Sequence, residues 1–209
     1  MKYDLVVVGG GLSGVCAAVA AARHGVKTLI IEKSNCLGGT ATNGLVVPFM
    51  PNKTKINCKQ VSLNNSIFEE IHKLLEERDA LLYESFLEEE LKLLLNRMVK
   101  ESGADILFHA SLLDVSKNGK RVNGVSVLTI EGEIKIEADY FIDATGDAQV
   151  AFLANLPFVL GRERDNLTQP MTLSFRVGGV DNECFFSGFN AVNQKYKEAR
   201  EMGEIKNPR

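Results

Sequence analysis

The sequence has no excess of basic residues, no closely spaced cysteines and no long apolar run, and each absence excludes a class of protein. Its 24 Lys and Arg against 27 Asp and Glu give a net charge of −3, so it has no basic footprint for nucleic acid. The apolar run from Leu5 to Val8 is too short to span a bilayer, and the Ala-rich stretch from Val15 to Ala22 is typical of a buried helix. No CxxC or ferredoxin-like pattern occurs among the four cysteines, which are Cys16, Cys36, Cys58 and Cys184.

The first residues, Met1 to Asp4, lead directly into an apolar segment, which leaves no room for a signal peptide. We therefore expect a cytoplasmic protein with free thiols and no membrane partner. Cys36 is the one thiol near the ligand site predicted below, and Cys16 is expected to pack inside a helix. The three histidines all fall on predicted structural elements, so the sequence indicates no catalytic base.

The most informative pattern lies within residues 3–33. A predicted strand at 3–8 runs into Gly9-x-Gly11-x-x-Gly14, a small-residue helix follows at 12–24, and a second strand at 27–31 ends on Glu32. Gly9 permits a tight turn, Gly11 lets the backbone approach a pyrophosphate, and Gly14 lets the helix pack close to the sheet. The helix N-terminus then offers free N–H groups to the phosphates, and Glu32 can accept hydrogen bonds from ribose hydroxyls while repelling a 2′-phosphate. This pattern predicts a dinucleotide site, which NAD and FAD proteins share.

The rest of the chain predicts further strands and helices of an α/β fold. A long polar connection at 33–64 is followed by two amphipathic helices, a buried strand and a β-meander. A strand at 140–143, a short helix at 148–154, a strand at 171–177 and a helix at 183–202 complete the prediction. The amphipathic helices are expected at 66–79 and 84–101, the buried strand at 105–108, and the meander strands at 111–116, 121–130 and 133–138.

Two more glycine motifs follow strand ends. Gly38-Gly39-Thr40 comes shortly after Glu32, and paired glycines there allow backbone approach to a second phosphate or a ribityl chain, which NAD domains do not need. The segment from Asp143 to Asp147 follows the meander, where ligands of such sheets bind at the carboxyl ends of the strands. Asp147 could cap the next helix or accept a hydrogen bond from a ribityl hydroxyl.

In this order, the three motifs resemble the FAD-dependent oxidoreductases of the glutathione-reductase-like fold, and among them the heterodisulfide-reductase-A-like subgroup. The likeness extends through Gly161-Arg162-Glu163, residues 169–176 and residues 178–181, and so covers nearly the whole chain. It implies an α/β fold: a Rossmann-like FAD-binding domain at 1–155, with a parallel sheet plus β-meander, and the start of a second, substrate or cap domain at 156–209. The family's sequences continue further, so the chain looks like an N-terminal portion.

The resemblance also implies FAD as cofactor and a contact for each matching residue. The glycine-rich turn would face the pyrophosphate, the acid would bind the adenosine ribose, the first meander strand would offer backbone groups to the adenine, and residues 40–44 would lie nearer the isoalloxazine. The predicted cofactor-binding set is Gly9, Gly11, Leu12, Ser13, Gly14, Glu32, Lys33, Gly38, Gly39, Thr40, Leu112, Ala144, Thr145, Gly146 and Asp147.

The function implied is transfer of hydride or electrons between a donor, NAD(P)H or another, and a small-molecule substrate. Three alternatives remain open: a truncated domain that binds FAD or ADP without turnover, an NAD-binding enzyme, and a fragment of an iron–sulfur flavoprotein. The second glycine pair and the Asp143–Asp147 motif argue against NAD, and the cysteine spacing offers no cluster site. The substrate, the catalytic residues and the oligomeric state do not follow from the sequence.

Overall fold

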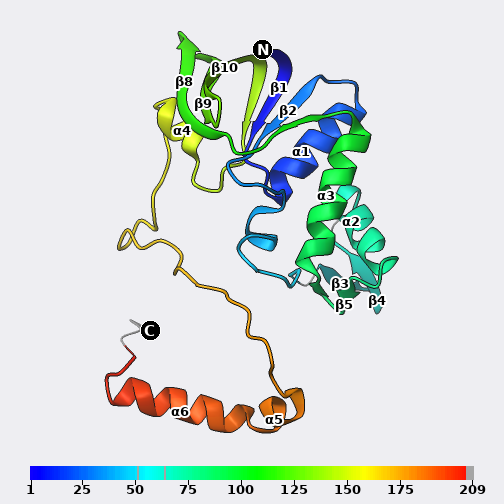
Figure 1. Ribbon diagram of the computed structural model, residues 1–209, viewed down its shortest axis with the longest axis vertical. Helices are drawn as coiled ribbons and strands as arrows, with labels where there is room; N and C mark the ends of the chain where they lie inside the picture. The colour runs from blue at the N-terminus through cyan, green and yellow to red at the C-terminus, as the bar shows by residue number, and fades with distance from the viewer. Residues whose placement is uncertain (51, 64, 206–209) are drawn as a thin grey trace. The chain divides into compact units, whose positions relative to one another are not determined.

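The computed structural model describes residues 1–50, 52–63 and 65–205 (Figure 1). The chain divides into two compact units, Met1–Ser174 and a second that begins at Phe175. The first unit contains all three glycine motifs. The predicted domain boundary after residue 155 stays a prediction, because compact units of the chain need not coincide with functional domains.

One six-stranded sheet organises the first unit. Its four parallel strands continue into an antiparallel meander, in the order β7 (Asp105–Leu107), β2 (Thr28–Ile31), β1 (Lys2–Val8), β10 (Gly132–Asp143), β9 (Arg121–Thr129) and β8 (Ser111–Asn118). All of β2 and the second half of β1 are buried. Such unbroken apolar runs are typical of parallel strands that are covered on both faces. The α/β fold with a parallel sheet plus β-meander is therefore confirmed.

Alternate residues of the central strands face two different hydrophobic clusters. Leu5, Val7 and Ile30 pack against the helix side, which is built by α1 (Leu12–Arg23), α2 (Ile67–Glu76) and α3 (Glu88–Ser102). Val6 and Ile31 belong to the other cluster, which includes side chains of the meander strands and of α4 (Gln149–Leu153). Figure 1 shows the helices on one side of the sheet and the meander with α4 on the other. This two-sided covering holds the carboxyl ends of β1, β2 and β10 in place.

The expected strands at 133–138 and 140–143 are one strand, β10. Its first half pairs antiparallel with β9 up to Glu137, and its second half pairs parallel with β1, where Asp143 lies opposite Val8. A strand of 12 residues is long enough to pair with two partners in succession. This register brings the Asp143–Asp147 motif next to the first glycine turn.

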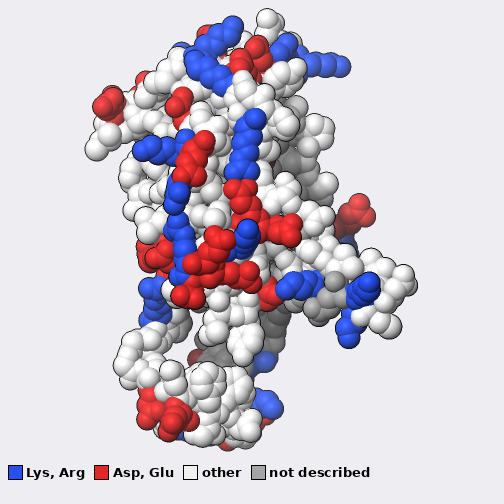
Figure 2. All heavy atoms as spheres, turned by 90° about the vertical axis from the view of Figure 1, so that its right-hand side faces the viewer, with Lys and Arg blue, Asp and Glu red and all other residues white. Residues whose placement is uncertain are grey.

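The two amphipathic helices form as α2, which lies inside the predicted bounds, and α3, which begins at Glu88 and ends at Ser102, one residue beyond them. A small hairpin of β5 (Leu81–Leu82) and β6 (Ser85–Phe86) joins the two helices. The polar connection, which predicted no regular structure, contains the 3₁₀ turn η1 (Gly39–Ala41) and a hairpin of β3 (Lys53–Ile56) and β4 (Lys59–Ser62). Acidic and basic side chains alternate over the helical face in Figure 2. An ion pair between Arg23 and Glu70 joins α1 to α2.

The second unit holds α5 (Asn182–Ser187) and α6 (Phe189–Glu201), separated at Gly188, where a single helix was expected. The predicted strand at 171–177 is wrong: no strand among the described residues pairs with it, and its apolar side chains are exposed. Alternating polarity alone does not make a strand without a partner to complete its hydrogen bonds. Across the described part of the chain, no helix combines the length and apolarity needed to cross a membrane.

Candidate functional site

A cavity of about 750 Å³ opens at the carboxyl ends of the parallel strands. It brings together every residue of the predicted cofactor-binding set except Gly14, which is buried in α1. Residues far apart in sequence meet here because β1, β2 and β10 end side by side. The cavity is also lined by Val8, Ile31, Ser34, Asn43, Gly44, Ala110, Ser111 and Gln149.

The three glycines of the first motif have different physical roles. Gly9 has a φ of +103°, and a Cβ there would lie 2.4 Å from the carbonyl oxygen of Ala144. A Cβ on Gly14 would lie 2.0 Å from the carbonyl oxygen of Gly9, so that position lets α1 approach the strand end. Gly11 differs from both, because a Cβ there would meet no protein atom within 4 Å and its φ of −64° suits any residue. The fold needs Gly9 and Gly14, whereas Gly11 leaves open a space that faces the cavity.

Helix α1 begins at this open position without a side-chain cap. The first N–H groups of an α-helix have no partner inside the helix and carry a partial positive charge. Leu12 and Ser13, in the first turn, both line the cavity. This end of the cavity is therefore suited to an anionic group such as a phosphate.

Glu32 is buried at the end of β2, where its carboxylate joins two loops. Oε2 accepts a hydrogen bond from the backbone N–H of Gly10 at 2.7 Å, and Oε1 accepts one from the N–H of Ser34 at 2.8 Å. An ionised carboxylate has about four acceptor sites, so it can still accept hydrogen bonds from a ligand. The sequence motif indicated the ligand role but not this structural one, which holds the glycine-rich turn against the strand that follows it.

The second glycine pair packs directly on the first motif. The N–H of Gly38 donates to the carbonyl of Gly10 at 2.8 Å, and a Cβ on Gly39 would lie 3.1 Å from the Cα of Gly11. Both Gly38 and Gly39 have positive φ angles, +107° and +58°. The two loops therefore form one backbone surface along the cavity. A side chain at Gly39 would press against Gly11, and one at Gly38 would meet the side chain of Thr42.

The third motif fixes its own loop through Asp143 and Thr145. One carboxylate oxygen of Asp143 accepts from the N–H and hydroxyl of Thr145, at 3.1 and 2.7 Å, and the other accepts from the N–H of Ala151 at 3.0 Å. The Thr145 hydroxyl in turn accepts from the N–H of Gln149 at 2.9 Å. Of the two roles considered for Asp147, helix capping is not observed: the helix begins at Gln149 after Ala148, which provides no side-chain cap. Asp147 lines the cavity.

Three of the lining residues that sequence reasoning missed, Ser34, Ala110 and Ser111, have no motif of their own. Ser34 follows Glu32 by two residues, a spacing at which a carboxylate accepts from a backbone N–H. Ala110 and Ser111 are placed by backbone hydrogen bonds, including one from the Ala110 N–H to the Glu32 carbonyl at 3.1 Å. The sequence indicates Ala110 and Ser111 only as small residues at the start of the first meander strand.

All four cysteines are free, and no group of His, Cys, Asp and Glu among the described residues could hold a metal ion. Cys16 packs against the helix-side core, as expected, and burial raises the pKa of its thiol. Cys36 is 7% exposed and donates a hydrogen bond to Oδ1 of Asn43 at 3.1 Å.

Comparisons with known proteins agree with this geometry. The model of the FAD dependent oxidoreductase family matches residues 4–208. The chain is 52% identical over 46 residues to dihydrolipoyl dehydrogenase of Trypanosoma brucei brucei, a match that spans 22% of this chain and 10% of that protein. It is 52% identical over 48 residues to glutathione reductase of Debaryomyces hansenii, which again spans 22% of this chain and 10% of the relative. The matched segment is thus about a tenth of the length of these relatives.

Two solved structures have the same fold at low sequence identity. THI4 of Thermovibrio ammonificans aligns with a TM-score of 0.54 and 20% identity, over 78% of this chain and 67% of that one. A geranylgeranyl bacteriochlorophyll reductase-like protein of Thermoplasma acidophilum aligns with a TM-score of 0.51 and 21% identity, over 80% of this chain and 44% of that one. The predicted heterodisulfide-reductase-A-like subgroup stays a prediction. The family match and the flavoprotein relatives indicate FAD as the cofactor, and the chain belongs to the FAD-dependent oxidoreductase family.

Proposed function

We propose that this chain holds FAD in the cavity at the strand ends and so forms the cofactor-binding part of an oxidoreductase that acts on a small molecule. When bound, FAD supplies the transfer of hydride or electrons, while the protein supplies binding and orientation. The cavity volume of about 750 Å³ falls in the range of about 300–1,000 Å³ that is usual for cofactor sites.

The proposed orientation follows from the chemistry of the lining groups. The free N–H groups at the start of α1 would bind the pyrophosphate, and Glu32 would accept hydrogen bonds from the adenosine ribose. Backbone groups at Leu112 would contact the adenine. The riboflavin half would then extend along the second and third motifs, toward residues 40–44 and 144–147.

The observation that carries the proposal is the open position at Gly11. Neither backbone strain nor contact with protein atoms requires glycine there, yet the position faces the cavity at the start of α1. A ligand that lies against the backbone at this point would explain why residue 11 is glycine. We therefore expect Gly11→Ala to fold normally and to bind FAD at least tenfold more weakly, because its methyl group would occupy the ligand's space.

Gly178→Ala is the matched control. A Cβ at Gly178 also meets no protein atom within 4 Å, but Gly178 is not among the cavity-lining residues. Binding of FAD to the three proteins can be measured by quenching of flavin fluorescence, with circular dichroism to verify the fold. Equal FAD affinity in the wild-type and Gly11→Ala proteins would contradict the proposal.

The same titration tests the alternative functions. The proposal predicts that FAD binds more tightly than ADP or NAD, since only FAD has a riboflavin half to contact the second and third motifs. Equal affinity for FAD and ADP would favour a domain that recognises only the ADP half, and tighter binding of NAD would favour the NAD-binding alternative. The electron donor, NAD(P)H or another, and the small-molecule substrate are expectations of the family resemblance.

A further inference from the structure

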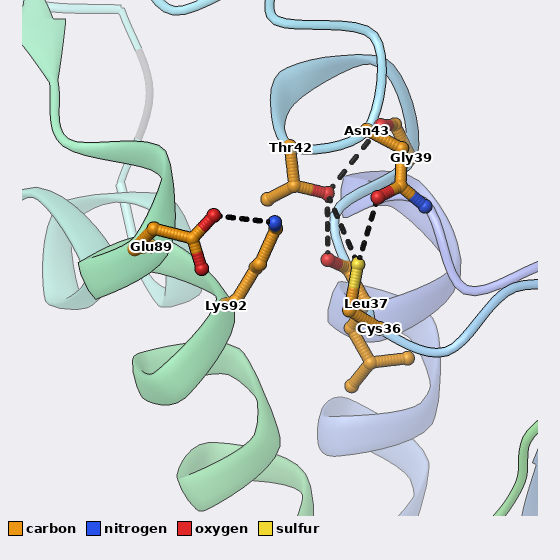
Figure 3. Close-up of polar contacts among 7 residues, drawn as sticks. All are labelled: Cys36, Leu37, Gly39, Thr42, Asn43, Glu89 and Lys92. Carbon is orange, nitrogen blue, oxygen red and sulfur yellow. Dashed lines mark hydrogen bonds and ion pairs between the residues drawn. The ribbon is translucent and has the colours of Figure 1, made fainter.

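Cys36 and Asn43 form a polar contact that no motif predicted. Cys36 lies between Glu32 and the second glycine pair and is buried, and Asn43 follows the 3₁₀ turn η1. The Cys36 thiol donates a hydrogen bond to Oδ1 of Asn43, with sulfur and oxygen 3.1 Å apart (Figure 3). The contact therefore links a core side chain to a residue that lines the cavity.

The backbone that holds these two residues is fixed from beneath. Thr42 and Leu37 are fully buried, and the Thr42 hydroxyl donates to the Leu37 carbonyl at 2.8 Å. The N–H of Gly44, next to Asn43, donates to the Gly39 carbonyl at 3.2 Å. Because the loop is closed on both sides of Asn43, the thiol contact fixes the side chain on an already ordered backbone.

This contact determines which end of the Asn43 amide faces a ligand. A side-chain amide has one acceptor oxygen and one donor nitrogen, and the thiol engages the oxygen. Figure 3 shows the amide nitrogen on the side away from Cys36. No hydrogen bond joins that nitrogen to another of the residues that the structure describes, and Asn43 is exposed at the cavity. Its two N–H donors are therefore available to a ligand.

Resting on the proposed function, we infer that Asn43 donates a hydrogen bond to the riboflavin half of FAD and that Cys36 is the positioning residue that orients its amide. In the proposed orientation, the pyrophosphate and ribose would have their own partners at α1 and Glu32. The isoalloxazine ring carries carbonyl oxygens and ring nitrogens that accept hydrogen bonds, and a fixed N–H donor complements them. A hydrogen-bond donor to the ring would favour electron density on it, and so would favour the reduced flavin.

The first test replaces Asn43 by Asp. Asn43→Asp keeps the shape and keeps an oxygen for the Cys36 thiol, but it places an acceptor where the N–H donors were. We expect FAD to bind about tenfold more weakly, because two acceptors then face each other, and the bound flavin to have a lower reduction potential and a shifted visible spectrum. ADP affinity should be unchanged, because ADP lacks the riboflavin half.

The second test separates positioning from packing. Cys36→Ser retains a hydroxyl donor for Asn43, whereas Cys36→Ala removes it. If Cys36 orients the amide, the serine variant keeps the wild-type FAD affinity and spectrum, and the alanine variant loses about two- to fivefold in affinity. If Cys36 only fills apolar space, the serine variant is affected more than the alanine variant. Cys184→Ser and Cys184→Ala, at an exposed cysteine, are the controls.

The outcomes distinguish this inference from the proposed function. Failure of the wild-type protein to bind FAD would overturn both. Normal binding of FAD to the wild-type protein, with the same affinity and spectrum in Asn43→Asp, would overturn the inference alone. An equal loss of FAD and ADP affinity in Asn43→Asp would also overturn it, because the damage would then not be confined to the riboflavin half.

Discussion

Replacing Gly14 by alanine should destabilise the protein, even though alanine is the better helix former. The added Cβ would lie 2.0 Å from the carbonyl oxygen of Gly9 and 3.2 Å from the Cβ of Ala144. The first distance is far below van der Waals contact, and the atom it meets is backbone, so α1 must move away from the strand end. Overpacking of this kind costs about 1–3 kcal/mol, and so short a contact with backbone places the cost at about 3 kcal/mol or more. The higher helix propensity of alanine offsets about 1 kcal/mol of this loss. We therefore expect a net loss of about 2 kcal/mol.

Gly11→Ala provides the comparison within the same turn. Its Cβ meets no protein atom, and its backbone conformation suits alanine, so the free energy of unfolding should stay the same or rise by about 0.4–1 kcal/mol. Urea unfolding of both variants without cofactor, followed by circular dichroism at 222 nm, measures the difference. The reasoning is refuted if Gly14→Ala is as stable as the wild-type protein, or if Gly11→Ala is the less stable variant.

Three further predictions concern other groups of the first unit. The Arg23 guanidinium holds the pKa of Glu70 below its ordinary value of 4.5, so the pair stabilises the fold above that pH and the contribution is lost as the pH falls through the lowered pKa. Because both side chains are more than a third exposed, urea unfolding should find Glu70→Gln about 0.5 kcal/mol less stable at about pH 7, and this gap should narrow as the pH falls through the lowered pKa; a gap that does not narrow in acid would contradict this. Burial raises the pKa of the Cys16 thiol, so an aromatic disulfide reagent at neutral pH should label Cys184 much faster than Cys16. Peptide mass spectrometry would measure the two labelling rates, and equal rates would contradict the burial of Cys16. Glu32→Ala should lower the free energy of unfolding by about 2 kcal/mol or more, because two backbone N–H groups lose their acceptor. Glu32→Gln should lose less stability in the same denaturation assay, and the reverse order would contradict the structural role of Glu32.

The central part of the site could be predicted because each residue there is subject to a local constraint that the sequence displays. Gly9 and Gly14 are required by close backbone contacts, and Glu32 ends a buried strand. The strand, turn, helix and strand around them are short-range structures. Their spacing therefore carries most of the information about how they fold.

Where the prediction differs from the structure, the deciding contact is one that local periodicity does not show. The second half of β10 continues its first half because β1 offers a parallel edge. Asp143 and Thr145, and not Asp147, accept hydrogen bonds from the backbone of α4. Segment 171–177 alternates in polarity but pairs with no described strand. Periodicity reports which faces are apolar but does not identify what covers them.

The contact between Cys36 and Asn43 had no sequence signal at all. Cysteine is a weak donor, and its hydrogen bonds follow from three-dimensional proximity rather than from spacing. Here the fold of the loop around η1 brings the thiol to within 3.1 Å of the amide oxygen. Such contacts emerge only once the turn is built.

The most direct test of the account is the visible absorbance spectrum of the purified chain, with any released cofactor identified by mass. The account predicts a flavin spectrum and FAD in a one-to-one ratio, either on isolation or after FAD is added. A folded but colourless protein that takes up no added FAD would contradict the claim that the cavity at the carboxyl ends of β1, β2 and β10 is sufficient to hold the cofactor.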